Sequence, residues 1–184
     1  MICGMDCRNC GAPMELFERR RYYFCSYCGT FHFIENPPVD GIRVLERPVD
    51  ALPCPLCQMP LAKSLLDDVY PLQHCEQCQG LLISRDGFVD AVARRRARES
   101  GPPAPPVPID QRELKRRLRC PSCKEQMEVH PYYGPGNVVI DNCGRCDLLW
   151  LDFGELRQIT EAPGRDRGHP RTTVMAAAFG DALE

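Results

Sequence analysis

Short strand-like segments, rather than long amphipathic helices, dominate the hydrophobic pattern of this chain. Phe31 and Phe33 alternate with polar neighbours, which is the period of a half-buried strand. The sequence Gly134-Pro135-Gly136 is a strong turn signal between two further apolar segments. The pattern therefore predicts small hairpins. The strand candidates are 14–18, 22–25, 30–34, 127–130 and 138–142.

Apolar runs at 81–83 and 148–151 each lead into a predicted helix. Ser84 is placed to cap a helix that ends near residue 100. Asp152 and Glu155 have the spacing of a capping box for a second helix, which ends before Pro163. A third helix is expected over 110–119, where an acidic cap is followed by a second acidic residue three positions later.

Cysteine separates this chain from ordinary globular proteins. There are 13 Cys among 184 residues and only 8% aromatics, so the chain is short of material for one large core. Twelve of them form six C-x-x-C pairs, grouped in three sets with 14, 17 and 19 residues between the pairs, and Cys3 is left over. The three sets are Cys7, Cys10, Cys25 and Cys28; Cys54, Cys57, Cys75 and Cys78; and Cys120, Cys123, Cys143 and Cys146.

Two C-x-x-C turns that meet across a hairpin place four thiolates around a tetrahedral ion, which is the ligand set of a structural zinc site. We therefore predict three Zn²⁺ ions with four Cys ligands each. A rubredoxin-like iron centre uses the same ligands, and disulfides are the other alternative. The odd number of cysteines disfavours a fully paired disulfide framework. The start MICGMDCRNC has neither a basic nor an apolar signal region, so a cytoplasmic location is expected.

The predicted fold class is a small metal-stabilised protein of three tandem zinc ribbons. Each ribbon is a short β-hairpin or three-stranded sheet, with short α-helices after the second and third. Proline-rich stretches separate the units. The predicted boundaries are ribbon one at 1–35, a linker at 36–53, ribbon two with its helix at 54–100, a Pro-rich spacer at 101–108, a helix with ribbon three and its helix at 109–162, and a tail at 163–184.

The second and third units share a motif of C-P-x-C, a hairpin, C-x-x-C, an apolar strand and a helix. In the third unit it reads CPSC at 120–123, CGRC at 143–146 and LLWLDFGEL at 148–156. This motif resembles the TFIIB-like zinc ribbon family of bacterial proteins over about 54–92 and 120–161. The second unit departs from D-x-G-E-L at 84–88, and residues 7–34 resemble only a generic zinc ribbon. The resemblance implies a zinc ribbon fold and, through the family's name, a link to transcription.

Closed sites with four protein ligands leave no open position for water or substrate, so we expect no enzyme activity. No run of 18 apolar residues is present, so no membrane partner is expected, and neither is a small-molecule substrate. The predicted role is an adaptor or scaffold that presents three ribbon modules to a protein complex through protein–protein interaction.

Clusters of basic residues support an alternative, a nucleic-acid-binding regulator. Three loaded sites would change the formal charge from −2 to about −8, which weakens general polyanion binding. A weaker alternative is a redox or zinc-handling protein in which one cluster releases metal on oxidation. The candidate contact residues are Arg19, Arg20, Arg21, Arg94, Arg95, Arg96, Arg98, Lys115, Arg116 and Arg117.

Overall fold

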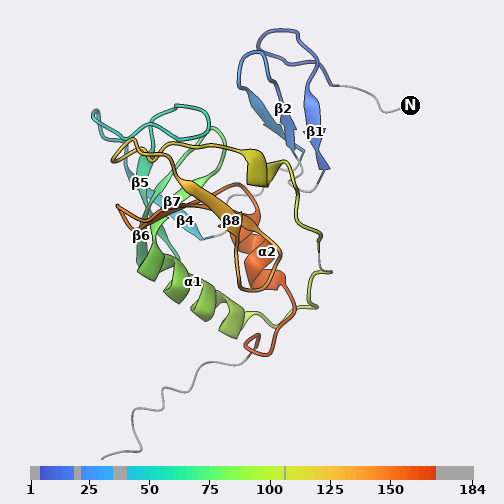
Figure 1. Ribbon diagram of the computed structural model, residues 1–184, viewed down its shortest axis with the longest axis vertical. Coiled ribbons are helices and arrows are strands. Elements are labelled where there is room, and N and C mark those ends of the chain that lie inside the picture. Colours follow the sequence, from blue (N-terminus) through green and yellow to red (C-terminus); the bar gives the residue numbers. More distant parts are fainter. Residues whose placement is uncertain (1–4, 19–21, 35–40, 106, 169–184) are drawn as a thin grey trace, which may run out of the picture.

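Two antiparallel sheets carry the fold of the computed structural model, which describes residues 5–18, 22–34, 41–105 and 107–168 (Figure 1). The small sheet has the order β1-β2-β3 and the large sheet has the order β4-β5-β6-β7-β10-β9-β8. Small sheets, two α-helices and three Cys₄ clusters confirm the predicted fold class. The elements are β1 Glu15–Phe17, β2 Tyr22–Phe24, β3 Phe31–Phe33, β4 Ile42–Glu46, β5 Ala62–Leu66, β6 Tyr70–His74, β7 Leu81–Ser84, α1 Arg85–Arg98, the 3₁₀ turn η2 Glu113–Lys115, β8 Glu128–Pro131, β9 Val139–Cys143, β10 Leu148–Leu151 and α2 Glu155–Glu161.

Ribbons two and three share one continuous sheet, because the last strand of each pairs with the other. The β7–β10 ladder is antiparallel and places Leu82 directly opposite Trp150. Leu82 and Trp150 follow the last cysteine of their ribbons at the same offset, so this pair marks the centre of an internal pseudo-twofold arrangement. Ribbons two and three are therefore fused side by side rather than held apart on a spacer.

Alternate residues of β7 and β10 serve two different cores, since successive side chains of a strand point to opposite faces. Leu81 and Leu151 face a core that also contains residues of α1 and α2. Leu82 and Trp150 face the other core, which contains cysteines of both ribbons. Figure 1 shows both helices on one side of the large sheet, with the small blue sheet away from them. The metal-binding ends of the two ribbons thus share one buried layer.

Both helices that follow the apolar strands are present. Ser84 caps α1 as predicted, because its side chain accepts a hydrogen bond from the backbone N–H of Gly87 at 3.2 Å. At α2, the backbone N–H of Asp152 donates to the Glu155 carboxylate at 2.6 Å, which is half of the predicted capping box. The Asp152 side chain instead accepts from the Trp150 indole at 2.8 Å. Among the described residues, neither helix is long and apolar enough to cross a membrane.

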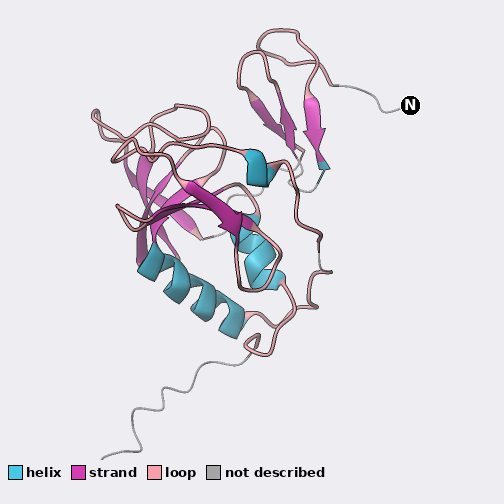
Figure 2. Cartoon of the chain, in the orientation of Figure 1, coloured by secondary structure: helices cyan, strands magenta, loops and turns pink. Residues whose placement is uncertain are grey.

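The prediction of a helix over 110–119 is wrong, because this segment forms only the single 3₁₀ turn η2 (Figure 2). Asp110 does accept a hydrogen bond from the Arg112 N–H, as a cap would. The chain leaves helical geometry at Arg116, which is extended at ψ 150. The cause is tertiary: the Arg116 guanidinium binds two buried carboxylates, and Leu118 enters the core around the cysteines. Burial of these side chains outweighs the weak helix preference of a short segment.

The segments predicted as connections are partly built into the fold. Strand β4 lies inside the predicted linker 36–53 and extends the large sheet by pairing with β5. The spacer 101–108 lies against ribbon three, where the backbone N–H of Ala104 donates to Glu161 O at 2.9 Å. Asn137 also donates to Val107 O at 3.0 Å. Of the predicted tail, the part at 169–184 lies outside the described residues.

Ribbon one meets the rest of the protein through an aromatic face. Alternate residues of β2 and β3 place their rings on the same side of the small sheet. Phe33 packs edge-on against Phe153 of ribbon three, with ring centroids 4.8 Å apart. Arg112 adds an ion pair with Glu15 at 3.0 Å and lies 5.4 Å above the Phe17 ring. An exposed ion pair and the aromatic rings of ribbon one, which join the core around the cysteines of ribbons two and three, therefore hold ribbon one in place.

Gly80 leaves room for the Trp150 indole at the centre of the fused sheet. A Cβ at position 80 would lie 2.2 Å from Cζ2 of Trp150, whose side chain is completely buried. We expect Gly80→Ala to lower the free energy of unfolding by about 1–3 kcal/mol, because an overpacked core must shift. The measurement is equilibrium unfolding at fixed free zinc. Gly144→Ala is the matched control, since its Cβ would meet nothing within 4 Å, and an equal loss in both variants would contradict the prediction.

Candidate metal centres

Three groups of four cysteines converge in the structure, each from two C-x-x-C turns. Within each group the four Sγ atoms lie within 4.8 Å of one another, and none of these twelve cysteines is in a disulfide. Cys3 lies outside the described residues. The groups are those expected from the spacing: Cys7, Cys10, Cys25 and Cys28; Cys54, Cys57, Cys75 and Cys78; and Cys120, Cys123, Cys143 and Cys146.

The sulfur–sulfur distances fit a single tetrahedral ion. The closest Sγ pairs are 3.5 Å for Cys7 and Cys28, and 3.4 Å for Cys57 and Cys75. In ribbon three, the Sγ atoms of Cys123 and Cys143 are 3.5 Å apart. A tetrahedron with zinc–sulfur bonds of about 2.3 Å has edges of about 3.8 Å, whereas a disulfide bond is about 2.05 Å. The donor set and its spacing therefore fit a closed four-thiolate zinc site.

Each C-x-x-C turn has the same backbone framework. In five of the six turns the carbonyl of the first cysteine accepts a hydrogen bond from the backbone N–H four positions later, as from Gln58 to Cys54 at 3.0 Å and from Lys124 to Cys120 at 2.9 Å. That fourth residue has positive φ in every turn, and it is Gly11 or Gly29 in ribbon one but non-glycine in the other two ribbons. The tight turn leaves both thiols on its concave side, so local geometry alone supplies two ligands.

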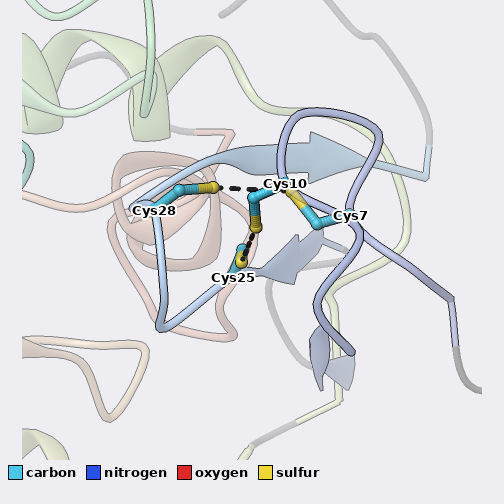
Figure 3. A group of neighbouring side chains, drawn as sticks. All are labelled: Cys7, Cys10, Cys25 and Cys28. Atoms are coloured by element: carbon cyan, nitrogen blue, oxygen red, sulfur yellow. Dashed lines mark hydrogen bonds between the residues drawn. The ribbon is translucent and has the colours of Figure 1, made fainter.

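The cluster of ribbon one is the one most open to solvent. Its four side chains point towards a common centre (Figure 3), with the Sγ atoms of Cys10 and Cys25 3.5 Å apart. Cys10 and Cys28 are exposed, while Cys7 and Cys25 are buried. The Thr30 hydroxyl, 3.1 Å from the Cys28 sulfur, lowers the pKa of that thiol to about 6. This favours the thiolate, which is the form that binds metal.

His74 supports the cluster of ribbon two without being a ligand. It is buried beside Cys75, and its Nε2 lies 3.1 Å from Oε1 of Gln79. Burial lowers the pKa of His74, so the ring is neutral at pH 7. Gln79 in turn donates to the Glu76 carbonyl at 2.8 Å, which braces the second C-x-x-C turn of the ribbon.

The basic run of α1 divides into internal and external residues. Arg96 is 1% exposed and donates to the Ile159 and Ala162 carbonyls at 2.6 and 2.9 Å. Arg95 pairs with Asp67 in a half-buried ion pair. Arg94 and Arg98 are exposed, although Arg94 lies over the Tyr70 ring. Of the four predicted contact residues, only these two are available to a partner.

The second basic run divides in the same way. Arg116 binds the buried carboxylates of Asp141 and Asp152, and these opposite charges raise its pKa despite burial. Arg117 is exposed, and its guanidinium donates to nearby backbone carbonyls. Lys115 is exposed as well. The predicted residues Arg19, Arg20 and Arg21 lie outside the described residues.

One arginine that links the two fused ribbons was not identified from the sequence. Arg85, at the start of α1, donates to the side chains of Asp147 and Asn142, each at 2.8 Å. Its backbone N–H also donates to the Asp147 carbonyl at 3.0 Å. Asp147 follows the last cysteine of ribbon three, so the contact joins the helix of one ribbon to a metal-binding turn of the other. No local pattern marks such a residue, because its partners are about 60 positions away in the chain.

Residues 119–162 match the family model described as a transcription factor zinc-finger, of the TFIIB zinc ribbon type. The match confirms the resemblance found in the third unit. It spans the third Cys₄ cluster together with β8, β9, β10 and α2, and covers about a quarter of the chain. No curated protein and no solved structure gives a significant match.

Proposed function

We propose that this protein is a non-enzymatic zinc-binding adaptor, in which three Zn²⁺ ions hold ribbon modules that dock on a larger protein complex. The observation that carries the proposal is the set of three Cys₄ clusters with tetrahedral spacing. Four protein ligands close each site, so the metal would serve the fold and offer no vacancy for substrate. A cytoplasmic location is part of the proposal, because free thiols persist in reducing compartments.

The adaptor would have two parts rather than three independent modules. Ribbons two and three share one sheet and one buried layer, so they would move as one body. Ribbon one packs on this body through Phe33 and Phe153. The link to transcription comes from the family that residues 119–162 match, and it makes a transcription complex the first partner to seek.

The test is metal counting followed by partner capture from a native lysate. We expect three zinc ions per chain and a partner complex that survives nuclease treatment. Capture with Cys143→Ser and Cys25→Ser, which disrupt the fused ribbons and ribbon one respectively, should lose the partner in only one case and so locate the surface. Recovery of the unpartnered chain alone would contradict the adaptor role, and far fewer than three ions would contradict the zinc sites.

Among the candidate contact residues that the structure describes, the exposed cations support the nucleic-acid alternative, namely Arg94, Arg98, Lys115 and Arg117. It predicts that the captured material is lost on nuclease treatment and that binding weakens steeply as salt rises. Arg96 and Arg116 are unsuitable for testing it, because their replacement would damage the fold.

A further inference from the structure

The three Cys₄ clusters differ in how far solvent reaches their sulfur atoms. In ribbon one, two of the four ligands, Cys10 and Cys28, are exposed. In ribbon two, three ligands are buried and Cys57 is half-buried. In ribbon three, two are buried and two are half-buried. An oxidant or a chelator in water therefore has more direct access to the sulfur ligands of ribbon one than to those of the other two clusters.

The packing around the clusters differs in the same direction. Among the described residues, the buried core at the first cluster consists of Cys7, Met14 and Cys25, while the buried rings of ribbon one belong to the neighbouring core. The other two clusters share a core with Leu82 and Trp150, both almost fully buried. Opening the first cluster would disturb three strands of three residues each, whereas opening either of the others would break into the fused sheet. Local opening costs least where few buried contacts are lost.

We propose that the Cys7, Cys10, Cys25 and Cys28 cluster is an exchangeable metal site, which releases its ion to peroxide-class oxidants and competing chelators while the other two clusters keep theirs. This inference rests on the proposed function, since it takes all three clusters to be loaded with zinc. It assigns the clusters different tasks: two hold the body together, and the first reports the redox or zinc status of its surroundings.

The chemistry of release balances with peroxide as the oxidant. Four zinc-bound thiolates give up four electrons and form two disulfides. Two molecules of hydrogen peroxide take up these electrons with four protons, their O–O bonds break, and four molecules of water form. The Zn²⁺ ion leaves unchanged in oxidation state, because it has lost its ligands. A strong chelator would remove the same ion without any electron transfer.

The protein contains its own reporter for the clusters that should stay loaded. Trp150 is the single tryptophan of the chain, and it is completely buried in the core that contains the cysteines of ribbons two and three. Its fluorescence therefore reports whether the fused body is intact. It should stay constant while the first ion leaves.

The experiment uses the full chain, first shown to hold three zinc ions. Limiting hydrogen peroxide is added with a chromogenic zinc chelator present, and oxidised cysteines are identified by differential alkylation and mass spectrometry. We expect one ion to leave about tenfold faster than the others, with disulfides confined to the four cysteines of ribbon one and with unchanged Trp150 fluorescence. Cys28→Ser should begin with two ions and lack the fast phase.

Release of all three ions at one rate, or release first from ribbon two or three, would overturn the inference. An initial count below three ions would instead overturn the proposed function, so the two failures are distinguishable. Repeating the measurement with the chelator alone separates exchange from oxidation: loss of the fast phase without peroxide would overturn the exchange half of the inference and leave oxidation-driven release standing.

Discussion

Cys75→Ala is expected to cost the protein two zinc ions, not one. Cys75 is a fully buried member of the second cluster, with its sulfur 3.4 Å from that of Cys57. Without it the site keeps three ligands and loses most of its affinity. A structural zinc site contributes about 10–16 kcal/mol in apparent terms, which is as large as the whole stability of a typical domain, about 5–15 kcal/mol. Ribbon two should therefore unfold when its ion is lost.

Ribbon three should unfold with it, because its core is completed by ribbon two. Trp150 lies directly opposite Leu82 of β7, and β10 pairs with β7 along one edge and with β9 along the other. The C-terminal end of α2 is held by Arg96 of α1. Loss of ribbon two would expose the indole and leave these carbonyls without their donor. The second and third clusters are thus coupled through the sheet that they share.

The measurement is zinc content by elemental analysis together with Trp150 fluorescence. We expect about one ion per chain and the emission of an exposed indole. Cys25→Ala is the matched control: Cys25 is equally buried and occupies the same turn position in ribbon one, so its loss should remove one ion and leave the fluorescence unchanged. Two retained ions with native emission in Cys75→Ala would show that the ribbons fold independently.

The metal ligands were accessible from the sequence because their signal is local. A C-x-x-C turn is a complete unit of backbone geometry, and two such turns at hairpin distance define a cluster without knowledge of the rest of the fold. The cap of α1 at Ser84 was predictable for the same reason, whereas α2 begins after Gly154 without the side-chain cap predicted at Asp152. The pairing of β7 with β10 was not, since it joins strands more than 60 residues apart and no short motif records it.

The roles of the basic residues illustrate the other limit of sequence reasoning. A run of arginines near the end of a helix is typical of a solvated face, and Arg94 and Arg98 fit that interpretation. The helical periodicity does give one indication that Arg96 is buried. Phe88, Val92 and Arg96 follow one another at intervals of four residues, so Arg96 continues the buried face of α1. The helix that fails at Arg116 had no such signal, because the carboxylates that fix this arginine come from other strands and turns.

Arg96→Met is expected to lower the free energy of unfolding by about 3–5 kcal/mol, the range for losing one partner of a buried charged network. The guanidinium donates to the Ile159 and Ala162 carbonyls at the end of α2 and to both oxygens of Asp166. The last carbonyls of a helix have no partner within it, so removal of the donor leaves them buried and unsatisfied. Equilibrium unfolding at fixed free zinc measures the loss.

Two further variants separate the contributions of Arg96. Arg98→Met changes an exposed arginine of the same helix and should shift stability by less than about 0.5 kcal/mol. Asp166→Asn removes the ion pair but keeps the donors to the carbonyls, and Asp166 is 53% exposed, so about 0–1 kcal/mol is expected. If Asp166→Asn were as damaging as Arg96→Met, the ion pair would be the main contribution. If it is mild, Arg96 acts chiefly as a helix cap supplied by the neighbouring ribbon, and the fused body is stabilised by backbone carbonyls that ribbon three cannot satisfy alone.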